Sequence, residues 1–173
     1  MSRLSSKQYA LCGVLAAMTA VLGYIALDFT SIKITFESFP VIIAGLMFGP
    51  LGGMVTGGIG TFIYQMLRYG FSVTTPIWIL PYIVCGAFAG YFARRGGFDL
   101  SRRQIIAVSV GSELLVTAIN TFGIYIDSHI YGYYYPTIIT GLLIPRVAIS
   151  IAKAVVLALV LPELLKTLKK TVR

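Results

Sequence analysis

The last long apolar run of the chain, residues 136–165, contains two basic side chains, Arg146 and Lys153. A run of this length and hydrophobicity is typical of a membrane-spanning helix. A cation near the bilayer centre costs about 2.5–3.5 kcal/mol on insertion scales, so such a residue normally faces a protein interior or a wet cavity. The two residues therefore predict a polar site inside a membrane protein.

The preceding apolar run, residues 104–125, places Glu113 and Asn120 on one helical face, together with Ser109 and Thr117. Because a short loop joins the two runs, we expect antiparallel neighbours, with Glu113 level with Lys153 and Asn120 level with Arg146. One carboxylate against two cations leaves a surplus positive charge, which an anionic ligand would complete. The alternative is that these charges form only a structural cluster.

The composition excludes a soluble domain. Of the 173 residues, 57% are hydrophobic and 12% are charged, and the longest polar segment, residues 94–103, is too short for a catalytic domain. The formal charge of +8 comes mainly from Lys and Arg that flank apolar runs, which indicates membrane topology and not nucleic-acid binding. Cys12 and Cys85 lie within apolar runs, and His129 is alone, so we expect no disulfide, metal or cofactor.

The sequence predicts an all-α integral membrane protein with a single domain over residues 1–173. Gly49 and Pro50 interrupt one long run, and proline disfavours helical geometry in the residue before it, so we expect a turn there. Both termini are expected in the cytoplasm, because most Lys and Arg then lie on the inner side. The segment between the first two helices alternates in polarity and is expected to be extended. The six predicted transmembrane helices cover about residues 8–27, 38–49, 51–67, 75–93, 104–125 and 136–165.

The predicted outer ends of the helices are rich in aromatic residues. Trp78 and Tyr82 share a helical face beside Pro81, where they either form an interfacial belt or line a pocket. Four tyrosines within residues 131–135 could cover a flat ligand. A concave, aromatic-lined pocket with a few polar groups is the usual small-molecule site. The candidate substrate-binding residues are Arg146, Lys153, Glu113, Asn120, Trp78, Tyr82, Arg68, Tyr69, Tyr133 and Phe36.

These features favour a binding subunit that depends on an external motor. The chain has no Walker motif to bind nucleotide and is short for an independent carrier. A small intramembrane enzyme or a channel is the alternative class. An enzyme is disfavoured because the sequence has no HExxH motif or Ser–His pair. A channel is disfavoured because the charged residues gather on two predicted helices instead of forming a ring.

The first apolar run contains Ala16 and Ala20, a pair of small residues that allows another helix to approach closely. Residues 34–40 read ITFESFP and residues 45–50 read GLMFGP. With these segments and its six predicted helices, the chain resembles the substrate-binding S components of energy-coupling factor (ECF) vitamin transporters, in particular the folate-type (FolT-like) members.

This resemblance implies a subunit of the bacterial cytoplasmic membrane that captures a vitamin at the outer face. It also implies import together with a membrane coupling subunit (EcfT) and two ABC ATPases, which would hydrolyse the ATP. Ala16 and Ala20 would then form the surface against the coupling subunit. Folate is the favoured vitamin, because surplus positive charge suits a glutamate tail and aromatic rings suit a pterin. Pantothenate is the alternative, since its single carboxylate would need only Arg146.

Overall fold

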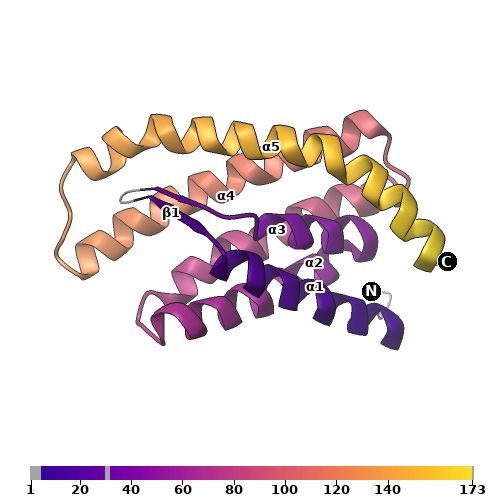
Figure 1. The fold of residues 1–173 in the computed structure, drawn as a ribbon, viewed down its shortest axis with the longest axis horizontal. Coiled ribbons are helices and arrows are strands. Elements are labelled where there is room, and N and C mark those ends of the chain that lie inside the picture. The colour runs from indigo at the N-terminus through magenta and orange to yellow at the C-terminus, as the bar shows by residue number, and fades with distance from the viewer. Residues whose placement is uncertain (1–4, 30–31, 173) are drawn as a thin grey trace.

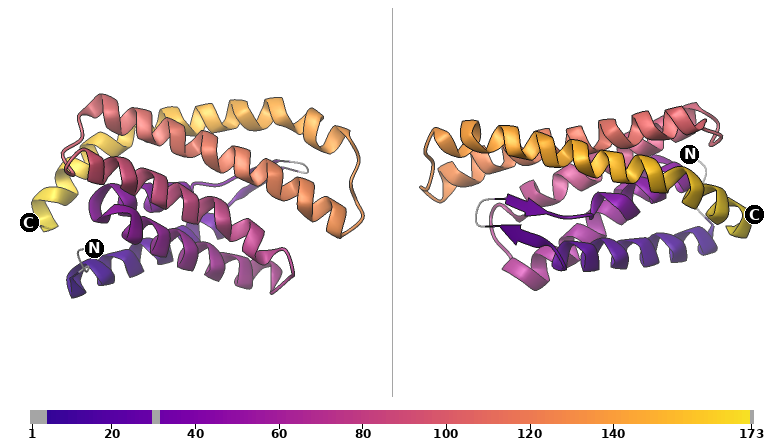
Figure 2. Two further views of the ribbon diagram at one scale, coloured as in Figure 1. Left: turned by 180° about the vertical axis from the view of Figure 1, so that it is seen from behind. Right: turned by 45° about the horizontal axis from the view of Figure 1, so that its top comes forward.

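The computed structural model describes residues 5–29 and 32–172, and this part of the chain forms five helices and one β-hairpin (Figure 1). In chain order the elements are α1 (Ser6–Tyr24), β1 (Leu27–Phe29), β2 (Ile32–Ile34), α2 (Ser38–Tyr69), α3 (Thr75–Arg95), α4 (Arg102–Ile130) and α5 (Thr137–Val172). Helices α4 and α5 form a long antiparallel pair along one side of the molecule. The β-hairpin lies between this pair and α1, and Figure 2 shows α3 beside α4 from behind.

Local sequence explains where several helices begin. Ser5 and Gln8 form a capping box at the start of α1, and Ser101 and Gln104 form another at the start of α4. Pro76 lies in the first turn of α3, where its missing N–H has no helical partner to lose. Four helices of the described chain, α2 to α5, are long and apolar enough to cross a membrane. The protein is therefore a multi-pass membrane protein, as the sequence predicted.

The prediction of six separate helices is not confirmed. The turn expected at Gly49 is a break within α2, where Gly49 has φ 81° and ψ −171° and Pro50 resumes the helix. Glycine reaches this positive φ without the steric penalty that a side chain would add. The start of α1 and the end of α5 lie at the same end of the molecule (Figure 1). That this end faces the cytoplasm stays a prediction.

Two further boundaries differ from the sequence prediction. Helix α4 continues to Ile130, five residues beyond its expected end at 125, and α5 runs from Thr137 to Val172 instead of ending near 165. The extended segment before α2 is confirmed as an antiparallel hairpin in which Leu27 pairs with Ile34. The longer α4 matters for the site, because it places Asp127 on a helix instead of in a loop.

Helix α2 packs against both α1 and α3 through glycine. A Cβ atom on Gly53 would lie 2.4 Å from the carbonyl oxygen of Gly86 in α3, and one on Gly60 would lie 2.6 Å from that of Ala16 in α1. Such distances are far below van der Waals contact, so the helix backbones touch only because these side chains are absent. These glycines therefore set how closely α2 approaches α1 and α3.

The role predicted for Ala16 and Ala20 requires correction. Their side chains are only 3% and 7% exposed, because the small-residue face of α1 is already packed within the chain. A coupling subunit could not contact them without separating α1 from its neighbour. On the same helix, Ala10, Gly13 and Ala17 are small residues that are exposed.

Candidate functional site

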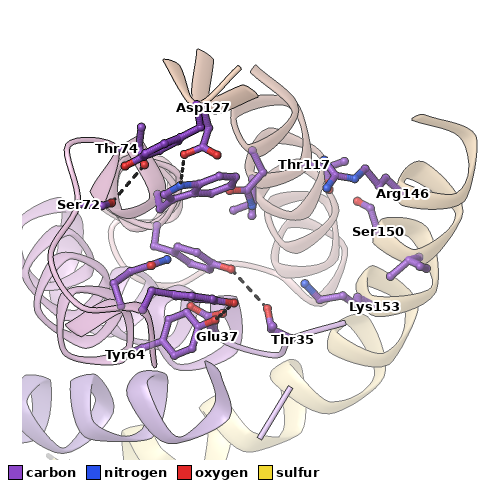
Figure 3. Close-up of a pocket in the computed structure, with 18 residues that line it drawn as sticks. Thr35, Glu37, Tyr64, Ser72, Thr74, Thr117, Asp127, Arg146, Ser150 and Lys153 are labelled. Atoms are coloured by element: carbon purple, nitrogen blue, oxygen red, sulfur yellow. Dashed lines mark hydrogen bonds between the residues drawn. The ribbon is translucent and has the colours of Figure 1, made fainter. Parts of the chain in front are cut away.

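A cavity of about 530 Å³ lies between α2 and α3 on one side and α4 and α5 on the other, with the segment after β2 contributing to its wall (Figure 3). Aromatic, hydroxyl and charged side chains together form its surface. The lining residues are Thr35, Glu37, Tyr64, Gln65, Tyr69, Ser72, Thr74, Trp78, Tyr82, Val116, Thr117, Asn120, Asp127, Tyr131, Arg146, Ile149, Ser150 and Lys153.

The wall formed by α5 is basic. Arg146, Ser150 and Lys153 are four and three residues apart, so they lie on one helical face, and all three project toward the cavity (Figure 3). Arg146 is partly buried and makes no ion pair or hydrogen bond with any residue that the structure describes. A guanidinium group in this position has five N–H donors available to a ligand.

Lys153 is held by a carboxylate of α4. Its Nζ lies 2.8 Å from Glu113 Oε2, and the two side chains are 11% and 1% exposed. The hydroxyl of Ser38, at the start of α2, donates a hydrogen bond to the other oxygen of Glu113. The predicted Glu113–Lys153 pair is therefore present. It joins three helices, and it leaves Lys153 at the cavity surface with its charge balanced.

The last turn of α4 contributes a buried carboxylate to the cavity, next to Trp78 of α3. Trp78 Nε1 donates a hydrogen bond of 3.3 Å to Asp127 Oδ1, and the hydroxyl of Tyr133 donates to Oδ2. Partial burial, aided by Asp127, raises the pKa of Tyr133 to about 12, so this hydroxyl keeps its proton at neutral pH. Asp127 is 9% exposed and lines the cavity. It fixes the indole ring of Trp78 and presents negative charge to a ligand.

A second acidic side chain, Glu37, follows the β-hairpin and is 2% exposed. Near it the hydroxyls of Thr35 and Tyr82 lie 3.4 Å apart. The hydroxyl of Tyr64 donates to that of Tyr69 at 3.3 Å, with the two rings arranged edge to face. This part of the cavity offers ring surfaces beside hydrogen-bond acceptors, as the close-up shows (Figure 3).

The structure brings six of the ten predicted substrate-binding residues to the cavity. These are Tyr69, Trp78, Tyr82, Asn120, Arg146 and Lys153. Glu113 lies behind Lys153, and Tyr133 contacts Asp127 without belonging to the lining. Arg68 Nη1 instead donates to the carbonyl oxygen of Tyr24 at 3.1 Å. Phe36 is also outside the lining, although Thr35 and Glu37 on either side belong to it, as expected where successive side chains alternate.

The acidic residues of the cavity, Glu37 and Asp127, are not among the predicted site residues. Asp127 continues the helical face of Glu113 and Asn120 at heptad-like spacing, a signal that was lost because α4 was expected to end at 125. Glu37 lies in the segment between the first two predicted helices, from which only Phe36 is predicted as a site residue. With both acids present, the cavity is lined by two basic and two acidic residues, Arg146 and Lys153 against Glu37 and Asp127. The predicted surplus of positive charge is therefore wrong, and a cavity with separate basic and acidic walls replaces it.

The described residues contain no cluster of His, Cys, Asp and Glu side chains that could hold a metal ion. The fold and the cavity define a multi-pass membrane protein with a polar ligand site between its helices. Residues 7–165 match the family model described as "ECF transporter, substrate-specific component". The chain therefore belongs to this family, whose members are the substrate-binding subunits of vitamin transporters.

Several solved structures share this fold. FolT bound with folic acid superposes with a TM-score of 0.70 at 22% identity, over 95% of this chain and 97% of that one. The S component of a bacterial ECF transporter has a TM-score of 0.68 at 20% identity, over 94% of this chain and 98% of that one. The S component for biotin from an ECF-type ABC transporter has a TM-score of 0.61 at 12% identity, over 90% of this chain and 93% of that one. At these identities the likeness shows a shared fold. No curated protein gave a significant match in sequence.

Proposed function

We propose that this protein is the high-affinity folate-binding S component of an ECF-type importer in the bacterial cytoplasmic membrane. It captures folate at the outer face and delivers it inward together with the coupling subunit EcfT and two ABC ATPases. The observation that carries the proposal is the cavity with two poles, in which Arg146 has no partner among the described residues and Asp127 lies beside a tryptophan.

The two poles match the two ends of folate. The pterin is flat and rich in N–H donors, from which the carboxylates of Glu37 and Asp127 can accept hydrogen bonds. The rings of Trp78 and Tyr82 can pack on its faces. The glutamate tail carries carboxylates, which the forked donors of Arg146 can bind in a charge-assisted pair. A volume of about 530 Å³ is within the usual range for small-molecule sites.

The likeness to FolT bound with folic acid supports this choice of ligand, whereas the likeness to an S component for biotin shows that the fold accommodates other vitamins. The ligand assignment therefore depends on the cavity. Pantothenate could use Arg146 through its carboxylate, but it has no donor-rich ring for the acidic wall. Biotin has a carboxylate and a ureido group with two N–H donors, but it lacks an aromatic heterocycle to stack on Trp78.

Binding can be followed through the intrinsic fluorescence of Trp78, the single tryptophan of the chain, which lines the cavity. Purified protein in detergent is titrated with folate, pantothenate and biotin, and we expect saturable quenching at the lowest concentration for folate. Arg146→Ala should weaken folate binding about 30-fold, since a buried charged hydrogen bond is worth about 2 kcal/mol. The matched control is Arg103→Ala, which removes an exposed arginine far from the cavity.

Tighter binding of pantothenate or biotin than of folate would contradict the assigned vitamin. Equal folate affinity in Arg146→Ala and Arg103→Ala would show that Arg146 does not contact the ligand. In a second assay, vesicles that contain this protein should accumulate folate only when the coupling subunit, the ATPases and ATP are all present. Uptake by the isolated protein would argue for an independent carrier or channel.

A further inference from the structure

Ser150 lies in the basic wall of the cavity between Arg146 and Lys153, and it is a buried serine that lines the cavity without a hydrogen bond among the described residues. The residue is 2% exposed, and its Oγ forms no hydrogen bond within the described part of the chain. The serines at 109 and 128 of α4 donate to backbone carbonyls of their own helix, and Ser112, which also has no hydrogen bond among the described residues, does not line the cavity. A buried hydroxyl without a partner costs about 1–3 kcal/mol, so this position is unfavourable in the protein alone.

The side chains beside Ser150 determine what kind of atom can satisfy it. Arg146 and Lys153 carry only donors, and both project from the same face of α5 toward the cavity (Figure 3). A ligand atom placed among two such donors and a hydroxyl must be an acceptor. Ser150 therefore donates to this atom.

The charges nearby separate an anionic position from a neutral one. Lys153 is already neutralised by Glu113 at 2.8 Å, so the space beside Ser150 and Lys153 suits an uncharged acceptor such as a carbonyl oxygen. Arg146, which no described residue neutralises, suits a carboxylate. Four residues of helix separate Arg146 from Ser150, or about 6 Å at 1.5 Å per residue.

We propose that Ser150 is a specificity-determining residue that donates a hydrogen bond to the amide carbonyl of an N-acyl amino acid, whose carboxylate binds Arg146. This inference rests on the proposed function, since it concerns the same ligand site. Folate and pantothenate both contain an amide carbonyl close to a carboxylate, whereas biotin does not. Ser150 thus recognises the amide carbonyl, a group that neither the carboxylate site at Arg146 nor the acidic residues of the cavity recognise.

The test combines a protein variant with a change of one ligand atom. Ser150→Ala and wild type are titrated with folate and with its thioamide analogue, in which sulfur, a weak acceptor, replaces the amide oxygen. Ser150→Ala should bind folate about 3- to 10-fold more weakly than wild type, as for the loss of one neutral hydrogen bond. Wild type should lose a similar factor for the thioamide, and the ratio of the affinities for folate and its thioamide should be smaller in Ser150→Ala than in wild type.

Thermal unfolding without ligand separates a binding role from a structural one. Because Ser150→Ala removes a buried hydroxyl without a partner, its melting temperature should equal or exceed that of wild type. The matched control is Ser112→Ala, a fully buried serine of α4 outside the cavity lining, which should leave both affinities unchanged. A structural role would instead lower the melting temperature of Ser150→Ala and weaken both ligands by the same factor.

The outcomes distinguish this inference from the proposed function. Equal affinity of wild type and Ser150→Ala for folate overturns the role of Ser150 and leaves folate binding intact. If wild type binds pantothenate and not folate, the vitamin assignment fails, and pantothenate with its thioamide analogue then decides the role of Ser150 in the same way. If wild type binds neither, both proposals are overturned.

Discussion

Helices α2 and α3 meet through glycine, whereas α4 and α5 meet around charged and hydroxyl side chains. A Cβ atom on Gly86 would lie 2.2 Å from the backbone of Gly53, so the first pair leaves no room between its helices. The second pair buries Glu113 against Lys153 and leaves Arg146 and Ser150 facing a cavity. The glycine contacts hold α2 and α3 close together, and the α4–α5 pair adds the basic groups of the cavity to the aromatic side chains that α2 and α3 contribute.

This difference has an energetic consequence. Close contact between glycine-lined helices gains van der Waals packing and desolvates no charge. Burying an ion pair contributes less to the stability of the fold than such packing, because the cost of desolvating the two charges offsets much of their attraction. The wall formed by α4 and α5 is thus stabilised less efficiently, which is expected of a surface that must interact with a ligand. The following predictions sharpen this comparison.

The largest effect is expected from Glu113→Gln. This change leaves the mostly buried Lys153 ammonium without its paired carboxylate, which should destabilise the protein by about 3–5 kcal/mol in the absence of ligand. The measurement is the melting temperature of purified protein in detergent. Adding Lys153→Met should recover much of the loss, because the unpaired charge is then removed. An unchanged melting temperature in the single variant would show that the pair contributes nothing to folding.

A smaller effect is expected from Gly86→Ala in the glycine-packed half. The added methyl would meet the backbone of Gly53, so α2 and α3 must separate, at a cost of about 1–3 kcal/mol. Gly13→Ala on α1 is the matched control, because a Cβ there has no neighbour within 4 Å. Thermal unfolding should therefore distinguish the two substitutions. Equal melting temperatures would contradict the backbone contact.

The smallest effect is expected from Tyr133→Phe, at the rim of the polar half. The substitution removes one hydrogen bond to Asp127 and should cost about 0.5–1.5 kcal/mol of stability. Folate affinity should fall slightly, because Asp127 and Trp78 become less well fixed. Tyr135→Phe removes a more exposed hydroxyl of the same loop and should change neither quantity. If the two variants behave alike, Tyr133 does not position Asp127.

Local sequence signals predicted a large part of the fold. The apolar runs identified the helices, and Gly49 with Pro50 identified the break in α2, since both signals act within a few residues of the chain. Helix ends were less predictable. Helix α4 continues through Tyr125 to Ile130 because its last turns pack in the bundle and bury Asp127 and Ser128, a tertiary contact with no local signature.

For the site, helical spacing correctly predicted that Glu113 meets Lys153 and that Arg146 and Asn120 line one cavity. It did not predict Glu37 or Asp127, because neither belonged to the apolar runs that defined the expected helices. Ala16 and Ala20 were misplaced for a related reason. A pair of small residues indicates that another helix approaches, but it does not indicate whether that helix belongs to the same chain.

By itself, the sequence determined that this protein crosses a membrane several times and that two cations of its last helix face inward, since hydrophobicity and charge act at every residue regardless of its neighbours. The tertiary structure decided which groups meet those cations. It neutralised Lys153 with Glu113, left Arg146 without a partner among the described residues, and brought Glu37 and Asp127 into the same cavity. Electrostatic interactions depend on distance in space, and distances between separate helices are set only when the helices pack.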